Sequence, residues 1–195
     1  ATIGGVTYQL NTDFRDVLEI IKYLNDTTKP EYIRWIIAIS LFFDEEIPRE
    51  YQEDAAKFLF NFISYDNQEA KPGHKLIDWQ QDASMIISDI NKVAGKEIRA
   101  EKYIHWWTFL SYFYGIGEGQ LSTIVGIRSK KAKGKKLEKW EQDYYRETEQ
   151  EAVLQHGNHY PPKFGIPCGA WGTALQPLCR VQNQVFSLYP GDPQG

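Results

Sequence analysis

The chain has 195 residues, a length that suits one domain with its own hydrophobic core. Its formal net charge of −4 argues against a general nucleic-acid-binding protein. No apolar run reaches the roughly 18–20 residues that span a bilayer, and no signal peptide is visible at the start. Two cysteines are too few for a secreted disulfide scaffold, so we expect a soluble protein of a reducing compartment.

Apolar residues repeat at helical spacing through most of the first 127 residues, after a polar arm over 1–12 that includes an extended segment at Val6–Leu10. Thr12 is predicted as the N-cap of the first helix, and Gly95 as the left-handed stop after the fourth. The second helix is apolar on nearly all sides, so we expect it to be buried. Helices are predicted, in chain order, over 13–25, 30–43, 48–64, 77–94, 103–114 and 121–126. The pattern predicts an all-α protein, a compact bundle of five to six helices over 13–127.

The fifth predicted helix is the centre of this bundle because large rings cover most of its surface. Tyr103, Trp106, Trp107, Leu110, Phe113 and Tyr114 form one broad stripe. Burial of each large ring stabilises the fold by roughly 1.5–3 kcal/mol. The predicted structural core consists of Trp79, Trp106, Trp107, Phe109, Leu110 and Phe113.

A basic run over 128–139 precedes an acidic segment over 140–151. Together they predict an exposed loop that runs into a charged, solvent-facing helix. The basic side chains can meet an acidic protein surface or neutralise phosphates, and the remaining alternative is a solvated loop that pairs loosely with the acidic helix. The predicted partner-binding residues are Arg128, Lys130, Lys131, Lys133, Lys135 and Lys136.

Residues 152–195 differ from the rest of the chain. They carry few charges, hold most of the prolines and both cysteines, and show no helical or alternating pattern. We expect an irregular tail of non-native or frame-shifted origin, with a genuine extra segment as the alternative. His156, His159, Cys168 and Cys179 have the chemistry of zinc ligands, but their spacing is irregular and includes no Cys-x-x-Cys pair.

Three further features have residue types that occur at sites of chemistry. His105 can be a general base, but we interpret it as a packing residue that is hydrogen-bonded to the backbone or to an aspartate. Asp78 and Asp82 can bind a metal as a pair, but Asp78 is better explained as a helix N-cap. The segment Gly115–Gly119 lacks the Lys-Ser/Thr of a phosphate loop and is read as a helix-ending loop. The sequence therefore predicts no enzyme, no cofactor and no metal site.

Four segments, in chain order, resemble one phage family. They are DFRDVL at 13–18, DWQQDA at 78–83, HWWTF at 105–109 and IVGIRS at 124–129. The chain resembles the tail assembly proteins of long-tailed phages of Gram-positive hosts, whose gene lies just ahead of the tape-measure gene. The likeness extends over about residues 8–147 and leaves 152–195 outside it.

The resemblance implies a non-catalytic tail assembly chaperone. Its expected partners are the tape-measure protein and the tail-tube protein. We expect the chaperone in the host cytoplasm and not in the mature virion. A helical bundle is suited to this role, because it can cover the apolar stripe of a partner helix that would otherwise aggregate. The alternative is a small helical nucleic-acid-binding or regulatory protein that uses the lysine-rich segment, and it predicts binding that weakens steeply with salt.

Overall fold

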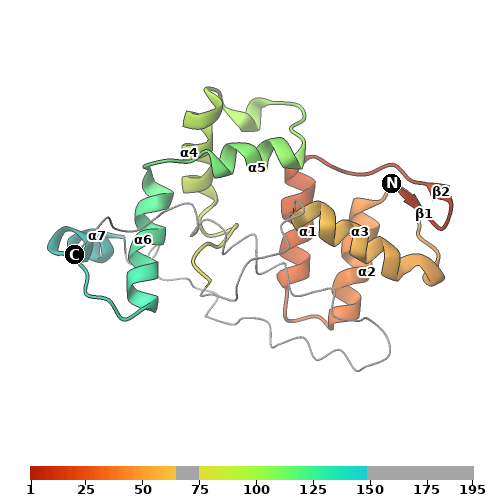
Figure 1. Cartoon of the computed structure of the whole chain (residues 1–195), viewed down its shortest axis with the longest axis horizontal. Coiled ribbons are helices and arrows are strands. Elements are labelled where there is room, and N and C mark those ends of the chain that lie inside the picture. Colours follow the sequence, from red (N-terminus) through yellow and green to blue (C-terminus); the bar gives the residue numbers. More distant parts are fainter. Residues whose placement is uncertain (65–74, 149–195) are drawn as a thin grey trace.

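The computed structural model describes residues 1–64 and 75–148, and these residues form a mostly helical protein (Figure 1). The predicted all-α fold is confirmed. A hairpin of two short antiparallel strands, β1 and β2, comes before the helices. The elements are β1 (Thr2–Ile3), β2 (Val6–Thr7), α1 (Phe14–Asn25), α2 (Glu31–Phe42), η1 (Arg49–Tyr51), α3 (Gln52–Ser64), α4 (Ala83–Ala94), η2 (Ile98–Ala100), α5 (Trp106–Tyr114), α6 (Gln120–Ala132) and α7 (Lys139–Glu147).

The helices form two groups that meet at α1 and α5. In the first group α2 packs against α1 and α3, and in the second group α4 packs against α5 and α6. The two groups are joined because α1 contacts α5. Figure 1 shows the first group at the end near the N-terminal hairpin, with α6 and α7 at the opposite end of the molecule.

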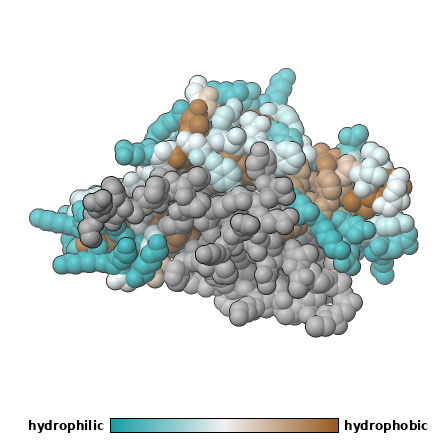
Figure 2. All heavy atoms as spheres, viewed as in Figure 1, coloured by the Kyte–Doolittle hydropathy of each residue, from teal (hydrophilic) through white to brown (hydrophobic). Residues whose placement is uncertain are grey.

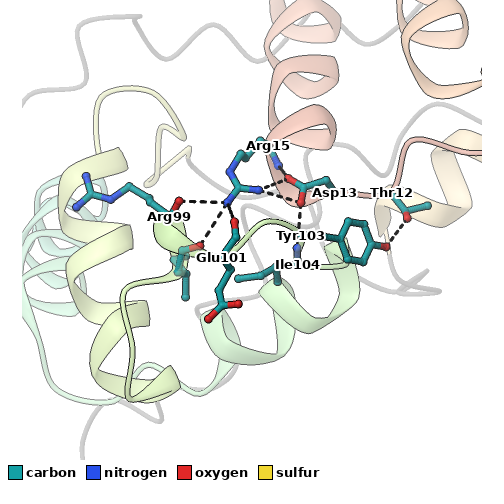
Figure 3. Close-up of polar contacts among 8 residues, drawn as sticks. Thr12, Asp13, Arg15, Arg99, Glu101, Tyr103 and Ile104 are labelled. Atoms are coloured by element: carbon teal, nitrogen blue, oxygen red, sulfur yellow. Dashed lines mark hydrogen bonds and ion pairs between the residues drawn. The ribbon is translucent and has the colours of Figure 1, made fainter.

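The junction between the two groups is a polar network around Asp13 and Arg15 (Figure 3). The Asp13 carboxylate accepts hydrogen bonds from the backbone N–H of Ile104 at 2.9 Å and from Arg15 Nη1 at 2.9 Å. Arg15 Nη2 donates to the carbonyl oxygen of Glu101 at 2.6 Å. The N-cap of α1 is therefore Asp13, and the prediction of Thr12 is wrong. The Thr12 hydroxyl instead lies 2.7 Å from the hydroxyl of Tyr103.

The backbone continues this junction on both sides of Asp13. The N–H of Phe14 donates to the carbonyl of Ile104 at 2.9 Å, and the N–H of Trp106 donates to the carbonyl of Thr12 at 2.8 Å. The Phe14 ring stacks on Phe109 with centroids 4.7 Å apart. One short stretch of chain thus fixes α1 against the segment that leads into α5.

The buried stripe of α5 consists of Trp106, Phe109, Leu110 and Phe113, a spacing that places all four on one side of a helix. The half-buried Trp79 ring packs beside this stripe, 5.0 Å from Phe113. The prediction that Trp107 belongs to the core is wrong, because its side chain is 43% exposed. The predicted stripe also included Tyr103, which precedes the helix and is exposed, since α5 begins only at Trp106.

Two helix boundaries differ from the predictions for physical reasons. The chain over 78–82 forms a turn, closed by a bond from the Asp82 N–H to the Asp78 carbonyl, so α4 starts at Ala83 rather than at 77. Helix α6 continues to Ala132, well past the predicted end at 126. The start of the basic run is therefore helical and is not part of a loop.

Candidate interaction surfaces

Arg128 lies inside the protein rather than on its surface. Its guanidinium makes a bidentate ion pair with Asp82, from Nη1 to Oδ2 at 2.7 Å and from Nη2 to Oδ1 at 2.8 Å. Nη1 also donates to the carbonyl oxygen of Leu76 at 2.9 Å. Both charged side chains are almost completely buried. The prediction that Arg128 binds a partner is wrong, because this side chain holds α6 against the start of α4.

Lys130 and Lys131 attach α7 to α6. Lys130 Nζ donates to the Glu141 carboxylate at 2.8 Å, and Lys131 Nζ lies 3.6 Å from the ring centroid of Tyr145. Burial raises the pKa of Glu141, but the hydrogen bonds from Lys130 and from the Glu138 N–H outweigh it and hold the pKa below its usual value. The helix predicted to face solvent therefore buries one of its acidic side chains.

The turn between α6 and α7 presents Lys133, Lys135 and Lys136 at the surface, and we call these three residues the cationic turn. The backbone of this turn is fixed, because Gly134 takes a left-handed conformation with φ of 65° and the Lys135 N–H donates to the carbonyl of Lys130 at 2.8 Å. Figure 2 shows hydrophilic side chains projecting from the α6–α7 end of the molecule. Lys131, Lys133, Lys135 and Lys136 are the exposed members of the predicted partner-binding set, and Lys131 also packs on Tyr145.

A second surface lies on α2, where the apolar pattern predicts burial. The expectation that this helix is buried is wrong for one of its sides, because among residues 1–64 and 75–148 it packs on α1 and α3 with the other side alone. On the opposite side Tyr32, Ile36 and Leu41 are 61%, 44% and 36% exposed. The covered side supplies Arg34, Trp35, Ala38, Ile39 and Phe42 to the interior.

The uncovered side of α2 is uncharged along its whole length. Arg34 is the one charged residue between positions 32 and 43, and it is buried, with Nη1 donating to the carbonyl of Leu24 at 2.6 Å. The Ser40 hydroxyl donates to the Ile37 carbonyl within the helix at 2.9 Å. Exposed faces of helices in globular proteins normally carry charged side chains, so this surface needs an explanation. We call it the α2 face; it consists of Tyr32, Ile33, Ile36, Ile37, Ser40 and Leu41.

The carboxylates of Asp78 and Asp82, the candidate metal pair, each have partners within the protein. Asp82 binds Arg128, while Asp78 accepts hydrogen bonds from Lys75 Nζ and from the N–H groups of Gln80 and Gln81. Burial raises the pKa of Asp78, but these hydrogen bonds together lower it below its usual value. Asp78 thus caps the turn that precedes α4. Within residues 1–64 and 75–148 no three His, Cys, Asp or Glu side chains converge as metal ligands.

The glycine-rich segment 115–119 ends α5 and leads into α6. Gly119 lies so close to Asp89 that an added Cβ would be 2.4 Å from Asp89 Oδ2. The same oxygen accepts a hydrogen bond from the Leu121 N–H at 2.9 Å, so a carboxylate from α4 caps the first turn of α6. A helix start that is occupied in this way does not offer an anion site. The set His156, His159, Cys168 and Cys179 lies outside the described residues.

His105 is the N-cap of α5. Its Nδ1 accepts a hydrogen bond from the Trp107 N–H at 3.1 Å, so the imidazole must be neutral at this nitrogen. The ring packs edge-on against both Phe62 and Trp107, with centroids 5.7 Å and 5.2 Å away. Burial lowers the pKa of His105. These contacts give the histidine a structural role at the start of the aromatic helix.

The capping role of His105 predicts a pH-dependent contribution to stability. The unfolded chain has a histidine pKa of about 6.5 and the folded pKa is lower, so the unfolded state binds more protons as the pH falls below that value. The contribution of the His105 cap to the free energy of unfolding is complete above pH 7, and it is lost as the pH falls through the pKa of His105 in the folded protein. We expect His105→Ala to cost about 0.5–2 kcal/mol at pH 7.5 and less at pH 5, measured by urea denaturation.

The control for this prediction is His105→Asn, whose side-chain oxygen can accept the same N–H at any pH. The difference in unfolding free energy between the wild type and this variant cancels the contributions of the other titrating groups. It should be constant above pH 7 and fall below that pH. A difference that stays constant from pH 7.5 to pH 5 would contradict the capping role.

The comparison with protein families points to a bacteriophage protein. None of the described helices is long and apolar enough to cross a membrane. Residues 1–154 match the family described as Bacteriophage Gp15 protein, so the chain belongs to that family. The resemblance to a phage family is therefore confirmed, and residues 155–195 lie outside the match. No curated protein and no solved structure shows a significant match.

Proposed function

We propose that the chain is a tail assembly chaperone, which binds the tape-measure protein and helps tail-tube subunits to assemble around it. In this proposal it acts in the host cytoplasm and leaves the finished particle. Membership of a bacteriophage family supports the proposal, together with the ordered segments through which the chain resembles tail assembly proteins. The observation that carries it is the α2 face, which exposes apolar side chains without a single charge.

A surface of this kind is suited to covering an apolar stripe of another protein. A tape-measure protein exposes long apolar stripes before the tube closes around it, and surfaces of this kind aggregate when they are left uncovered. An amphipathic helix can lay its apolar side on the apolar side of another helix. A protein that keeps an uncharged helical face exposed can therefore cover such a stripe and keep its partner in solution.

The cationic turn provides a second point of contact in this proposal. Lys130 and Lys131 contact Glu141 and Tyr145, and the acidic residues of α7 lie close in sequence to the three lysines of the cationic turn. This mixed charge is poorly suited to following a phosphate backbone, whereas it can select and orient an acidic patch on a partner protein. We therefore favour a protein partner over a nucleic acid.

The test is co-expression with the tape-measure protein that the same phage encodes. We expect the soluble fraction of the tape measure to rise several-fold when this chain is present, because its apolar stripes are covered. The same vector with an unrelated helical protein is the control. A soluble fraction that does not change would contradict the proposed function. Titration of labelled single-stranded DNA at low salt tests the alternative, and we expect no binding.

A further inference from the structure

We propose that the α2 face is the docking site for an amphipathic helix of the partner whose apolar stripe ends in basic residues, with that basic end against Asp44, Glu45 and Glu46. This inference rests on the proposed function, since it names the surface and the chemistry of the partner. Three observations carry it: the shape of the face, the charge at one of its ends, and the poor match between two copies of the face.

The shape of the α2 face suits one helix. Tyr32, Ile36 and Ser40 form a row at intervals of four residues, and Ile33 and Ile37 form a second row beside it. Ser40 is the smallest side chain of the first row, and its hydroxyl is already bonded within the helix, so a partner backbone can approach there without leaving a polar group unpaired. The 12 residues of α2 span about 18 Å, which matches three turns of a partner helix.

The charge at one end of the face fixes the chemistry of the partner. Asp44, Glu45 and Glu46 directly follow α2, and all three are exposed. Within residues 1–64 and 75–148 their carboxylates form no ion pair with a lysine or arginine. The C-terminal end of the α2 dipole adds negative potential at the same place. A partner helix with lysine or arginine at one end therefore gains a complementary contact there.

The other end of the face carries no comparable charge, which argues against a second copy as the occupant. Lys29 is engaged in an ion pair with Asp26 just before α2. Two α2 faces packed antiparallel would place each acidic triplet against this neutralised end, and two packed parallel would place the triplets against each other. Neither arrangement provides a cation for the acidic triplet, whereas a helix with a basic end does.

The direct test uses two fluorescein-labelled peptides with the same leucine stripe, one ending in three lysines and the other in three glutamates. Fluorescence anisotropy with the full chain should show tighter binding of the lysine-ended peptide, by about tenfold at low salt. Ile36→Lys should weaken that binding by about tenfold or more. The triple variant Asp44→Asn/Glu45→Gln/Glu46→Gln should remove the preference between the peptides and most of the salt dependence.

The matched control is Val93→Lys, which makes the same change at a residue of α4 that is 40% exposed. It should bind the peptide within about twofold of the wild type. Both lysine variants are expected to keep the helical circular dichroism of the wild type, because the replaced side chains lie at the surface. Equal peptide binding by the wild type and Ile36→Lys, or equal binding of the two peptides by the wild type, would overturn the proposal.

Co-expression with the tape measure separates this inference from the proposed function. Rescue of solubility by the wild type and by Val93→Lys, but not by Ile36→Lys, supports both. Rescue by all three proteins would overturn the docking site and leave the function standing, whereas rescue by none would overturn the function. A wild-type dimer that Ile36→Lys dissociates in sedimentation would show that a second copy occupies the face, which also overturns the inference.

Discussion

Replacing Arg128 with alanine is expected to lower the free energy of unfolding by about 3–5 kcal/mol, the cost of breaking a buried ion pair by removing one partner. The Asp82 carboxylate would stay fully buried without its two hydrogen bonds from the guanidinium. The carbonyl of Leu76 would lose its donor as well. Urea denaturation followed by circular dichroism measures the effect.

Three further variants make the expectation specific. Arg128→Lys keeps the charge but cannot make the bidentate pair, so its loss should be intermediate. Lys136→Ala removes an exposed lysine nearby and should change stability by no more than about 0.5 kcal/mol. The double variant Asp82→Ala/Arg128→Ala should cost clearly less than the sum of the single variants, because neither charge is then left alone. A loss below about 1 kcal/mol for Arg128→Ala would contradict the role assigned to the pair.

Arg128 is buried whereas the lysines of the cationic turn are exposed, and the count of charges in this segment does not distinguish them. Composition placed Arg128 with the lysines that follow it, because a count of charges does not record the direction of a side chain. Helical spacing did carry the signal: Leu121, Ile124, Val125 and Arg128 lie on one side of a helix. An arginine at the end of an apolar stripe points inward and needs a buried acceptor, which for Arg128 is the Asp82 carboxylate.

Helix existence was predictable, whereas several helix starts were not. The apolar residues of α1 repeat on one side, and this periodicity is a local property of the sequence. Its N-cap depends on a distant segment, because Asp13 is held by the N–H of Ile104. The start of α4 likewise depends on Asp82, whose carboxylate is bound by Arg128 from α6. Caps that tertiary contacts stabilise cannot be found from neighbouring residues alone.

The α2 face was misjudged for a related reason. A helix that is apolar on nearly all sides is buried only when enough neighbouring helices are available to cover it. Here α1 and α3 cover one side, and the number of neighbours is a property of the topology. The sequence shows that Arg34 is the one charged residue between positions 32 and 43, and the structure shows that it is buried, which leaves the exposed side of the helix without charge.

The second large effect is expected at Trp106, whose replacement by alanine should cost about 3–5 kcal/mol. Its side chain is completely buried, stacks on Phe109 with centroids 5.5 Å apart, and donates from Nε1 to the carbonyl of Ile63 at 3.1 Å. The substitution would leave a cavity between α3 and α5 and a carbonyl without its donor. Chemical denaturation followed by far-ultraviolet circular dichroism gives the loss without depending on tryptophan emission.

The neighbouring Trp107 is the matched comparison, since the same substitution is made one residue further along the same helix. Trp107 also donates to a carbonyl of α3, that of Phe62 at 3.0 Å, but its ring is substantially exposed. Trp107→Ala should therefore cost about 1–2 kcal/mol, for one hydrogen bond and partial burial. Trp106→Phe should fall between the two alanine variants, because it keeps most of the packing and loses the donor. The two side chains lie on the same helix and make the same type of hydrogen bond, so they differ chiefly in how much of the ring is covered. Equal losses of unfolding free energy for Trp106→Ala and Trp107→Ala would therefore contradict the effect expected from burial.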